Sequence, residues 1–255
     1  VGINADDSAK CFSCGEFMPS YTKACGGKDM QSTTTQTKKP DMVDEGKFSA
    51  LTDRKISMQT AQKYGVKCVH DLQGNVVKHL YPYYNGHELS ATKTRNCRDK
   101  DFYISGTYND TGLFGQQLFK SGKYVTITEG ECDAMAAYEL LGSKWAVVSI
   151  KRGANGAVRD IKESLEFFDD FENVIIAFDK DKAGQEASIK VARLFKPGKA
   201  RIVTLPNGWK DPNDMLKNNR HKEFVEAWWS AKVYTPSGVI NVSEQREKFH
   251  NRERK

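Results

Sequence analysis

Carboxylates follow two apolar, β-rich runs in the middle of the chain. Glu129 comes just after residues 124–127, and Asp179 and Asp181 follow residues 174–178. Because side chains alternate along an extended chain, the two aspartates point the same way. The carboxyl ends of strands in a parallel sheet meet at one edge, so we expect all three side chains to converge there.

Three neighbouring carboxylates repel one another unless a cation lies among them. A set of oxygen ligands without a His or Cys cage suits Mg²⁺ or Mn²⁺ rather than Zn²⁺. Such ions serve phosphoryl transfer, where they clamp the attacking and leaving oxygens. The alternative is that these acids are turn or capping residues, because short acidic motifs often match by chance.

The motifs come in order, with a strand–helix rhythm between them. TEGECD at residues 128–133, FDKDKAG at residues 178–184 and WKDPND at residues 209–214 resemble the acidic motifs of Toprim domains and, more closely, of DnaG-type primases. The resemblance is strongest to the primase halves of bifunctional phage primase–helicases, and it extends from Cys11 to the polar tail. One motif alone is unspecific, whereas the ordered set is specific.

The resemblance implies a DNA primase that makes RNA primers from ribonucleoside triphosphates on a single-stranded DNA template. Glu129, Asp179 and Asp181 would hold Mg²⁺ or Mn²⁺, and Asp211 and Asp133 would complete the acidic patch. The family often has Asp-Pro-Asp in the third motif, where this sequence has Asn in the middle position. We therefore expect Asp211 to serve the site and Asp214 to cap a helix.

The densest basic run before the acidic motifs covers residues 93–100 and contains Lys93, Arg95, Arg98 and Lys100. A charge run is usually a solvated strand and turn. Positive charge is also what a triphosphate and a template backbone require. The phage-type primases carry a basic strand here, so the resemblance makes these four residues candidate nucleotide- or template-binding residues, with Lys93 and Lys100 foremost.

A Gly-rich basic turn follows the expected strand at residues 145–150. It reads KRGANG over residues 151–156 and lacks the GxxxxGK[ST] pattern of a P-loop. Backbone N–H groups of such a turn can bind phosphate, and Lys151 is a candidate nucleotide-binding residue. A plain connecting loop is equally consistent with this sequence.

Cys11 and Cys14 form a CxxC pair near the N-terminus. This spacing is typical of half a structural zinc site, although a redox pair or two unrelated thiols remain alternatives. The resemblance implies that another Cys pair lies upstream and that the complete ribbon binds Zn²⁺ and helps to read the template.

The composition limits the remaining choices. The chain has 255 residues, 28% of them charged, and a net charge of +6, which fits a polyanionic partner. We find no apolar run of membrane-spanning length and no secretory signal, and six cysteines do not suggest a disulfide scaffold. We expect no membrane contact and a cytoplasmic location, in the host cell if a phage encodes the protein.

The expected fold is α/β: a Toprim domain with a central, mostly parallel sheet flanked by helices, preceded by a smaller basic α+β subdomain and a partial zinc-ribbon segment. The expected parts are a ribbon (1–30), a flexible linker (31–45), the basic subdomain (46–120), the Toprim subdomain (121–232) and a linker toward a helicase (233–255). Helices are expected at 131–141, 158–168, 184–195 and 221–232.

Two other functions stay open at this point. One is a Toprim-type nuclease, and the other is a catalytically inactive single-strand-binding module of a replicative helicase. The primase hypothesis predicts as partners single-stranded DNA, ribonucleoside triphosphates and the RNA primer. By resemblance, it adds a hexameric helicase in the same polypeptide and a replicative DNA polymerase. Tyr81, Tyr83 and Tyr84 could stack on bases or simply pack.

Overall fold

The computed structural model describes residues 46–99 and 101–236, together with the backbone of three short strands near the N-terminus. These strands are β1 (Gly2–Ile3), β2 (Ala9–Lys10) and β3 (Phe17–Met18), and they form an antiparallel sheet. The chain divides into two compact units, Val1–Lys38 and Lys39–Lys255. Cys11, Cys14 and Lys100 lie outside the described residues, so their roles stay predictions.

The first sheet of the second unit is antiparallel and has the order β4-β5-β6-β7. Its strands are β4 (Lys67–His70), β5 (Val76–Asn85), β6 (Glu88–Asn96) and β7 (Phe102–Gly106). The first two hairpins turn at Gly74 and Gly86, both with positive φ, a conformation that glycine adopts without strain.

A 3-10 turn, η1 (Thr52–Arg54), and a helix, α2 (Met58–Tyr64), precede this sheet. The helix begins at Ser57, whose Oγ accepts the N–H of Thr60 at 3.2 Å. It ends at Gly65 with φ of 74°. A serine cap at the start and a left-handed glycine at the end are the expected boundaries of a short helix.

The second sheet has the order β12-β11-β10-β8-β9. Its strands are β8 (Gly122–Thr128), β9 (Ala146–Ser149), β10 (Phe171–Ala177), β11 (Ala200–Ile202) and β12 (Lys232–Val233). Only β12 is antiparallel to its neighbour. The second halves of the central strands β8 and β10 are buried on both faces, as expected for parallel strands that helices cover on both sides.

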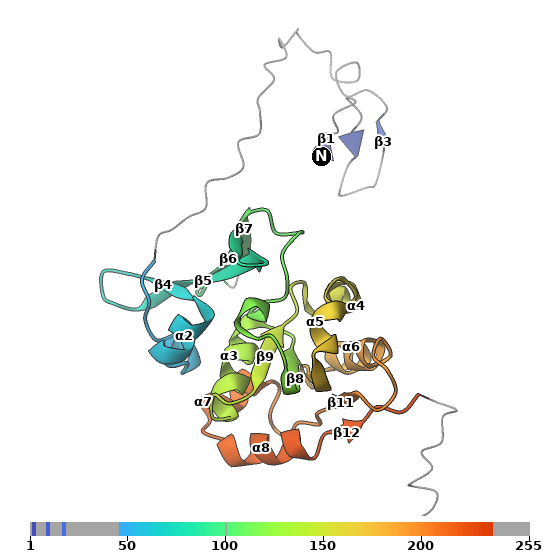
Figure 1. Cartoon of the computed structure of the whole chain (residues 1–255). Helices are drawn as coiled ribbons and strands as arrows, with labels where there is room; N and C mark the ends of the chain where they lie inside the picture. The colour runs from blue at the N-terminus through green and yellow to red at the C-terminus, as the bar shows by residue number, and fades with distance from the viewer. Residues whose placement is uncertain (1, 4–8, 11–16, 19–45, 100, 237–255) are drawn as a thin grey trace, which may run out of the picture. The chain divides into compact units, whose positions relative to one another are not determined.

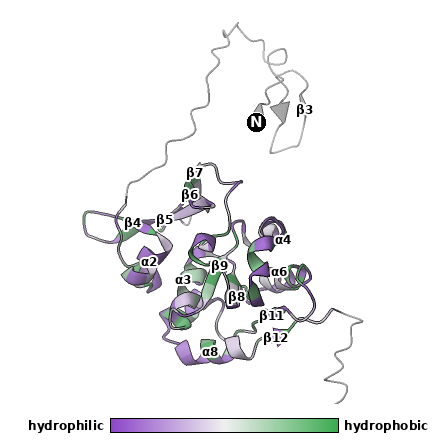
Figure 2. Ribbon diagram, in the orientation of Figure 1, coloured by the Kyte–Doolittle hydropathy of each residue, from purple (hydrophilic) through white to green (hydrophobic). Residues whose placement is uncertain are grey.

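Helices cover both faces of this sheet (Figure 1). One face carries α3 (Glu131–Leu140), α7 (Pro212–Lys217) and α8 (His221–Trp229). The other carries α4 (Gly153–Glu163), α5 (Leu165–Asp169) and α6 (Lys182–Ala192). In Figure 2, α4 and α6 show hydrophobic residues beside hydrophilic ones, the pattern of helices with one buried face.

The two apolar cores lie on opposite faces of the parallel sheet. The first also joins the two sheets, because Tyr64, Tyr81 and Tyr83 pack with Phe114 in it. These tyrosines are buried, so Tyr81 and Tyr83 pack and do not present faces to bases. Tyr84 is only half-buried.

Three expected boundaries were wrong. The predicted turn at 151–156 is largely the first part of α4, because Gly153, with φ of 64°, lets the helix begin directly after β9. The predicted helix at 158–168 is broken at Ser164, where α5 begins separately. The predicted helix at 221–232 stops at Trp229 and leaves Lys232–Val233 as an edge strand. Among the described residues, no helix combines the length and apolarity needed to cross a bilayer.

Candidate active site

Glu129, Asp179 and Asp181 emerge at the same edge of the parallel sheet. Strands β8 and β10 are parallel neighbours, with Thr128 opposite Ala177. Glu129 therefore leaves β8 at the level where the 179–181 segment leaves β10. Their charges interact: burial raises the pKa of Glu129, and the neighbouring Asp179 and Asp181 raise it further.

Glu129 has one satisfied and one unsatisfied oxygen. Its Oε1 accepts the N–H of Ala154, in the first turn of α4, at 3.2 Å. Its Oε2 is buried and has no hydrogen-bond partner among the described residues. Because a buried carboxylate oxygen without a partner is costly, this atom marks a place where a cation would be stabilising.

Asp179 forms an ion pair with the ammonium group of Lys210. The distance from Lys210 Nζ to Asp179 Oδ2 is 2.9 Å. Burial raises the pKa of Asp179, the hydrogen bond from Lys210 lowers it, and the charges of Asp211 and Asp181 raise it again. The net direction is upward, so one lysine does not neutralise this group of acids.

Asp181 caps α6, since its Oδ1 accepts the N–H of Gly184 at 2.9 Å. The capping alternative is thus correct for one oxygen of this residue. Gly184 has a second role: a Cβ there would lie 2.3 Å from the carbonyl oxygen of Asp179. Only glycine lets the helix start so close to the acidic segment.

Asp211 and Asp133 are neighbours and extend the group of acids. Asp211 caps α7, accepting the N–H of Asp214 at 2.7 Å. The expectation that Asp214 is the cap was therefore wrong, because Pro212 begins the helix one residue after Asp211. Asp133 Oδ1 accepts the N–H of Asn213 at 3.2 Å. Burial raises the pKa of Asp133, and Asp211 and Asp179 add to the shift.

Lys93 extends from the antiparallel sheet toward the acidic rim, as we call the edge of the parallel sheet that carries Glu129, Asp179 and Asp181. Its Nζ lies 2.7 Å from Glu131 Oε1 and 3.4 Å from the carbonyl oxygen of Lys151. The hydroxyl of Tyr83 donates to the same Glu131 oxygen at 2.6 Å. Glu131, the second Glu of TEGECD, was missed by the sequence analysis, because its partners lie 38 and 48 residues away and no local pattern connects them.

The other basic candidates differ in their surroundings. Arg95 is half-buried, with an Nε that has no partner among the described residues. Its guanidinium lies 5.7 Å from the ring centroid of Phe102, and Lys93 Nζ lies 4.9 Å from the same centroid. Arg98 has a side chain 74% exposed and a long ion pair of 3.9 Å with Asp71. Arg98 is thus open to solvent, whereas Arg95 is partly covered.

Lys151 occupies a structural position instead. Its side chain is buried, and Nζ donates to the carbonyl oxygens of Thr111 and, at 3.3 Å, Asn109. Burial lowers its pKa. The ammonium group does not face solvent, so this placement speaks against the predicted direct contact with a nucleotide.

A different set of potential ligands is packed more tightly. Among the described residues, only Asp53, His79 and Cys97 bring their ligand atoms within 4.8 Å of one another. We interpret this set as structural. His79 Nε2 already bonds Asp53 at 2.9 Å, the charges of Arg54 and Arg95 lie close by, and burial raises the pKa of Cys97 to about 11.

The acidic residues at the strand ends are more widely spaced than that set, but their chemistry fits a divalent ion. They supply only oxygen donors, they raise one another's pKa, and one buried oxygen lacks a partner. Mg²⁺ keeps several of its waters and takes one or two carboxylates, so widely spaced ligands suit it.

Comparison with known proteins agrees with this geometry. Residues 126–216 match the family model described as Toprim-like. The DNA helicase/primase of Enterobacteria phage T3 is 32% identical over 249 residues, which cover 94% of this chain and 43% of that protein. The chain thus spans less than half the length of this relative.

Solved structures extend the comparison. The primase fragment of the bacteriophage T7 primase–helicase is 30% identical, with a TM-score of 0.66 over 89% of this chain and 92% of that one. A chain in a structure of T7 lagging-strand DNA polymerase interacting with primase domains of two gp4 subunits is 35% identical, with a TM-score of 0.67 over 74% and 94%. A DnaG primase catalytic domain bound to single-stranded DNA shares the fold at 17% identity and a TM-score of 0.54, over 72% and 73%.

The motifs, the two sheets and the coverage of the T7 primase fragment agree, and the chain belongs to the family of primase domains of phage primase–helicases.

Proposed function

We propose that this chain is the priming part of a primase–helicase. It joins ribonucleoside triphosphates into short RNA primers on a single-stranded DNA template and releases pyrophosphate. The observation that carries the proposal is the group of carboxylates at the ends of β8 and β10, in which repulsion and burial raise the pKa values of Glu129 and Asp179.

In this proposal Glu129, Asp179 and Asp181 hold Mg²⁺ or Mn²⁺, and Asp133 and Asp211 orient them from the outside. A bound ion of this kind neutralises charge on the triphosphate during phosphoryl transfer. The chain's own residues position the reactants. Glu131 and Tyr83 hold Lys93 beside the acidic rim, where its ammonium group can bind a phosphate.

Further parts of the site would bind the template and the triphosphate. Arg95, Arg98 and Lys100 supply positive charge on and after β6. The Cys11–Cys14 pair would contribute to a zinc module that reads the template if a complete ribbon binds Zn²⁺. By analogy with the T7 assembly, the RNA primer would pass to a replicative DNA polymerase, and a hexameric helicase would follow in the same polypeptide, within the cytoplasm of a host cell.

The test is short-RNA synthesis from labelled ribonucleoside triphosphates on a random single-stranded template with Mg²⁺. The full-length protein is used, because the zinc module and helicase belong to the reaction. Asp179→Asn and Asp181→Asn should abolish synthesis, and Asp170→Asn, an exposed acid at the opposite end of β10, should not.

Two outcomes would contradict the proposal. Cleavage of DNA without synthesis would indicate a Toprim nuclease. Salt-dependent binding of single strands with no metal-dependent turnover would indicate an inactive binding module. Synthesis that survives both aspartate substitutions would remove these residues from the metal site.

A further inference from the structure

The cavity bounded by the β5–β6 turn, residues 109–120 and the α4–α5 junction plays no part in the reaction described above. It has a volume of about 630 Å³, within the range of ligand pockets. We propose that it binds one unpaired base of a single-stranded nucleic acid, outside the acidic site. The proposal needs a nucleic-acid ligand but no metal ion and no turnover.

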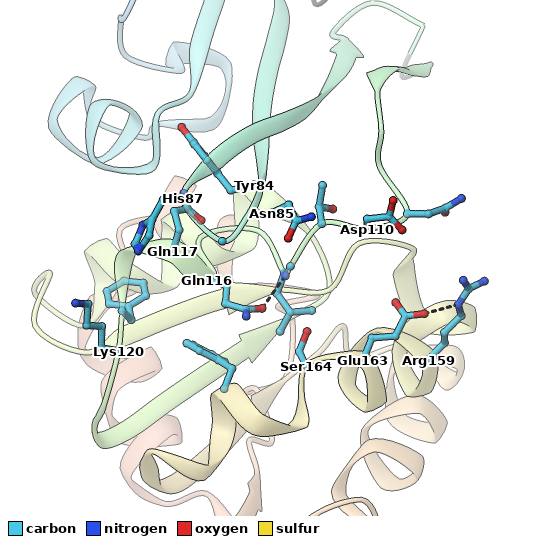
Figure 3. A pocket seen from close by; sticks show the side chains of 17 residues that line it. Tyr84, Asn85, His87, Asp110, Gln116, Gln117, Lys120, Arg159, Glu163 and Ser164 are labelled. Atoms are coloured by element: carbon cyan, nitrogen blue, oxygen red, sulfur yellow. Dashed lines mark hydrogen bonds and ion pairs between the residues drawn. The ribbon is translucent and has the colours of Figure 1, made fainter. Parts of the chain in front are cut away.

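The cavity concentrates polar side chains that have no partner. Asn85, His87, Gln117 and Lys120 line it (Figure 3), and within the described part of the chain none of these four side chains makes a hydrogen bond or an ion pair. Four unpaired groups that converge on one hollow are the arrangement expected of a polar ligand site.

The chemistry of the lining matches a base better than other small ligands. Asn85 and Gln117 offer amide donors and acceptors, as the hydrogen-bonding edge of a base requires. Phe119 and Phe167 line the same cavity and provide apolar ring surface, and bases of single strands stack on such rings. The free carboxylate of Asp110 can accept from an exocyclic amino group.

The charges at the cavity suit a strand rather than a free cation. Lys120 is exposed and unpaired where it lines the cavity, so it can contact a phosphate. Glu163 is already neutralised, since Arg159 Nε bonds it at 2.8 Å (Figure 3) and its pKa is lowered by that hydrogen bond. The negative charge of Glu163 is thus compensated within the fold.

Internal contacts hold the wall of the cavity in place. Gly112 N–H donates to the carbonyl oxygen of Tyr84 at 2.9 Å, and Leu113 N–H donates to Gln116 Oε1 at 2.9 Å. Behind this wall, Lys151 Nζ bonds the carbonyl oxygens of Thr111 and Asn109. The buried lysine therefore fixes a preformed wall, and little ordering would oppose binding.

One short segment separates the cavity from the acidic rim. Ala154 donates to Glu129 on the rim side, whereas Lys151 and Arg152 bond Asn109 on the cavity side. Residues 151–154 thus contact both the acidic edge of the sheet and one wall of the cavity.

The test measures binding without catalysis. A fluorescein-labelled, random-sequence 15-nucleotide DNA is titrated with the full-length protein in EDTA, and anisotropy gives the Kd. The double variant Asn85→Ala/Gln117→Ala should raise the Kd about fivefold to thirtyfold, the expected effect of losing two hydrogen bonds at the site. The matched control, Gln59→Ala/Gln62→Ala, removes two exposed amides from α2 and should leave the Kd unchanged.

Photocrosslinking of a 5-bromouracil-substituted oligonucleotide to the unaltered protein gives an independent readout. Crosslinks within residues 84–87, 109–120 or 159–167 support the proposal. An unchanged Kd in the double variant, or crosslinks confined to other residues, would overturn it. Because Asp179→Asn should bind the oligonucleotide normally in EDTA, failure of primer synthesis and failure of base binding can be told apart.

Discussion

Two groups of carboxylates in this molecule have opposite electrostatic environments. At the ends of β8 and β10, burial and mutual repulsion raise the pKa values of Glu129 and Asp179. Elsewhere a partner lowers the pKa: the hydrogen bond and charge of His79 outweigh partial burial at Asp53, and Arg159 acts on Glu163. The first group has too few positively charged partners to offset its negative charge. Each acid of the second group has such a partner within the fold.

The difference shows that burial alone does not mark a functional acid. Asp160 is fully buried, yet it accepts the backbone N–H groups of Lys151 and Arg152 at 2.7 and 3.0 Å and bonds the Arg152 guanidinium. A buried acid with complete partners stabilises the fold. A buried acid whose neighbours are other acids indicates a site for a cation.

The largest expected effect is a loss of stability, and it comes from replacing Asp160, the buried acid whose partners lie within the fold. Asp160→Ala removes the acceptor of two backbone N–H groups and one of the acceptors of the Arg152 guanidinium, which should lower the free energy of unfolding by about 3–5 kcal/mol. Urea denaturation followed by circular dichroism measures it. Asp170→Ala, at an exposed position, should change the free energy by less than about 0.5 kcal/mol. A small effect at Asp160 would mean that water replaces its partners.

The next largest expected effect is a loss of activity, and it comes from replacing an acid at the ends of β8 and β10. Glu129→Gln keeps the side-chain size but removes a charge, so primer synthesis should fall on the order of 10²–10³-fold, as when one group that stabilises the transition state is removed. The free energy of unfolding should not fall, because repulsion is relieved. The matched variant Glu223→Gln breaks an exposed ion pair with Arg220 and should keep full activity. Equal losses in both variants would contradict the comparison.

The sequence predicted the positions of the acids at the strand ends better than the partners of Glu131 and Lys151. Glu129, Asp179 and Asp181 follow apolar strands directly, and strand ends in a parallel sheet share an edge. The partners of Glu131 and Lys151 could not be predicted, because Lys93, Tyr83 and Thr111 lie on a separate sheet and loop. Whether a lysine faces solvent or a carbonyl group depends on tertiary packing that local pattern does not encode.

The residues at which helices begin were the other feature that the sequence did not predict correctly. A glycine in KRGANG is read as a loop signal, yet Gly153 allows α4 to begin at once after β9. Similarly, Asp211 and Asp214 are both good caps by type, and only the position of Pro212 at the first turn decides between them.

A divalent ion should stabilise the protein, and the effect should depend on pH. At about ten times its Kd the ion adds about 1.4 kcal/mol, or about 3–6 °C in Tm for a domain of this size. The folded-state pKa values of Glu129, Asp179 and Asp133 are raised, so the metal-free fold loses stability as pH rises from the unfolded values through the folded ones. Protons compete with the ion at low pH.

Differential scanning fluorimetry with and without Mn²⁺ checks this prediction. The shift in Tm should be larger at pH 8 than at pH 5. It should vanish in the Asp179→Asn/Asp181→Asn double variant, whose metal-free form should be at least as stable as the parent at pH 8. A shift that is equal at both pH values would mean that the ion binds elsewhere.

The smallest expected effect concerns Lys210, a positively charged partner within the group of acids at the strand ends. Its ammonium group lies 2.9 Å from Asp179 while its side chain is 60% exposed, so it supplies a weak internal cation where the metal ion would bind. An exposed ion pair is worth about 0.2–1 kcal/mol. Removing it with Lys210→Gln should therefore tighten Mn²⁺ binding up to about fivefold, as measured by electron paramagnetic resonance of free Mn²⁺.

Lys180→Gln is the control, since that lysine bonds Asn207 and not an acid. If Lys210→Gln weakened Mn²⁺ binding, the lysine would be holding Asp179 in position for the ion rather than competing with it.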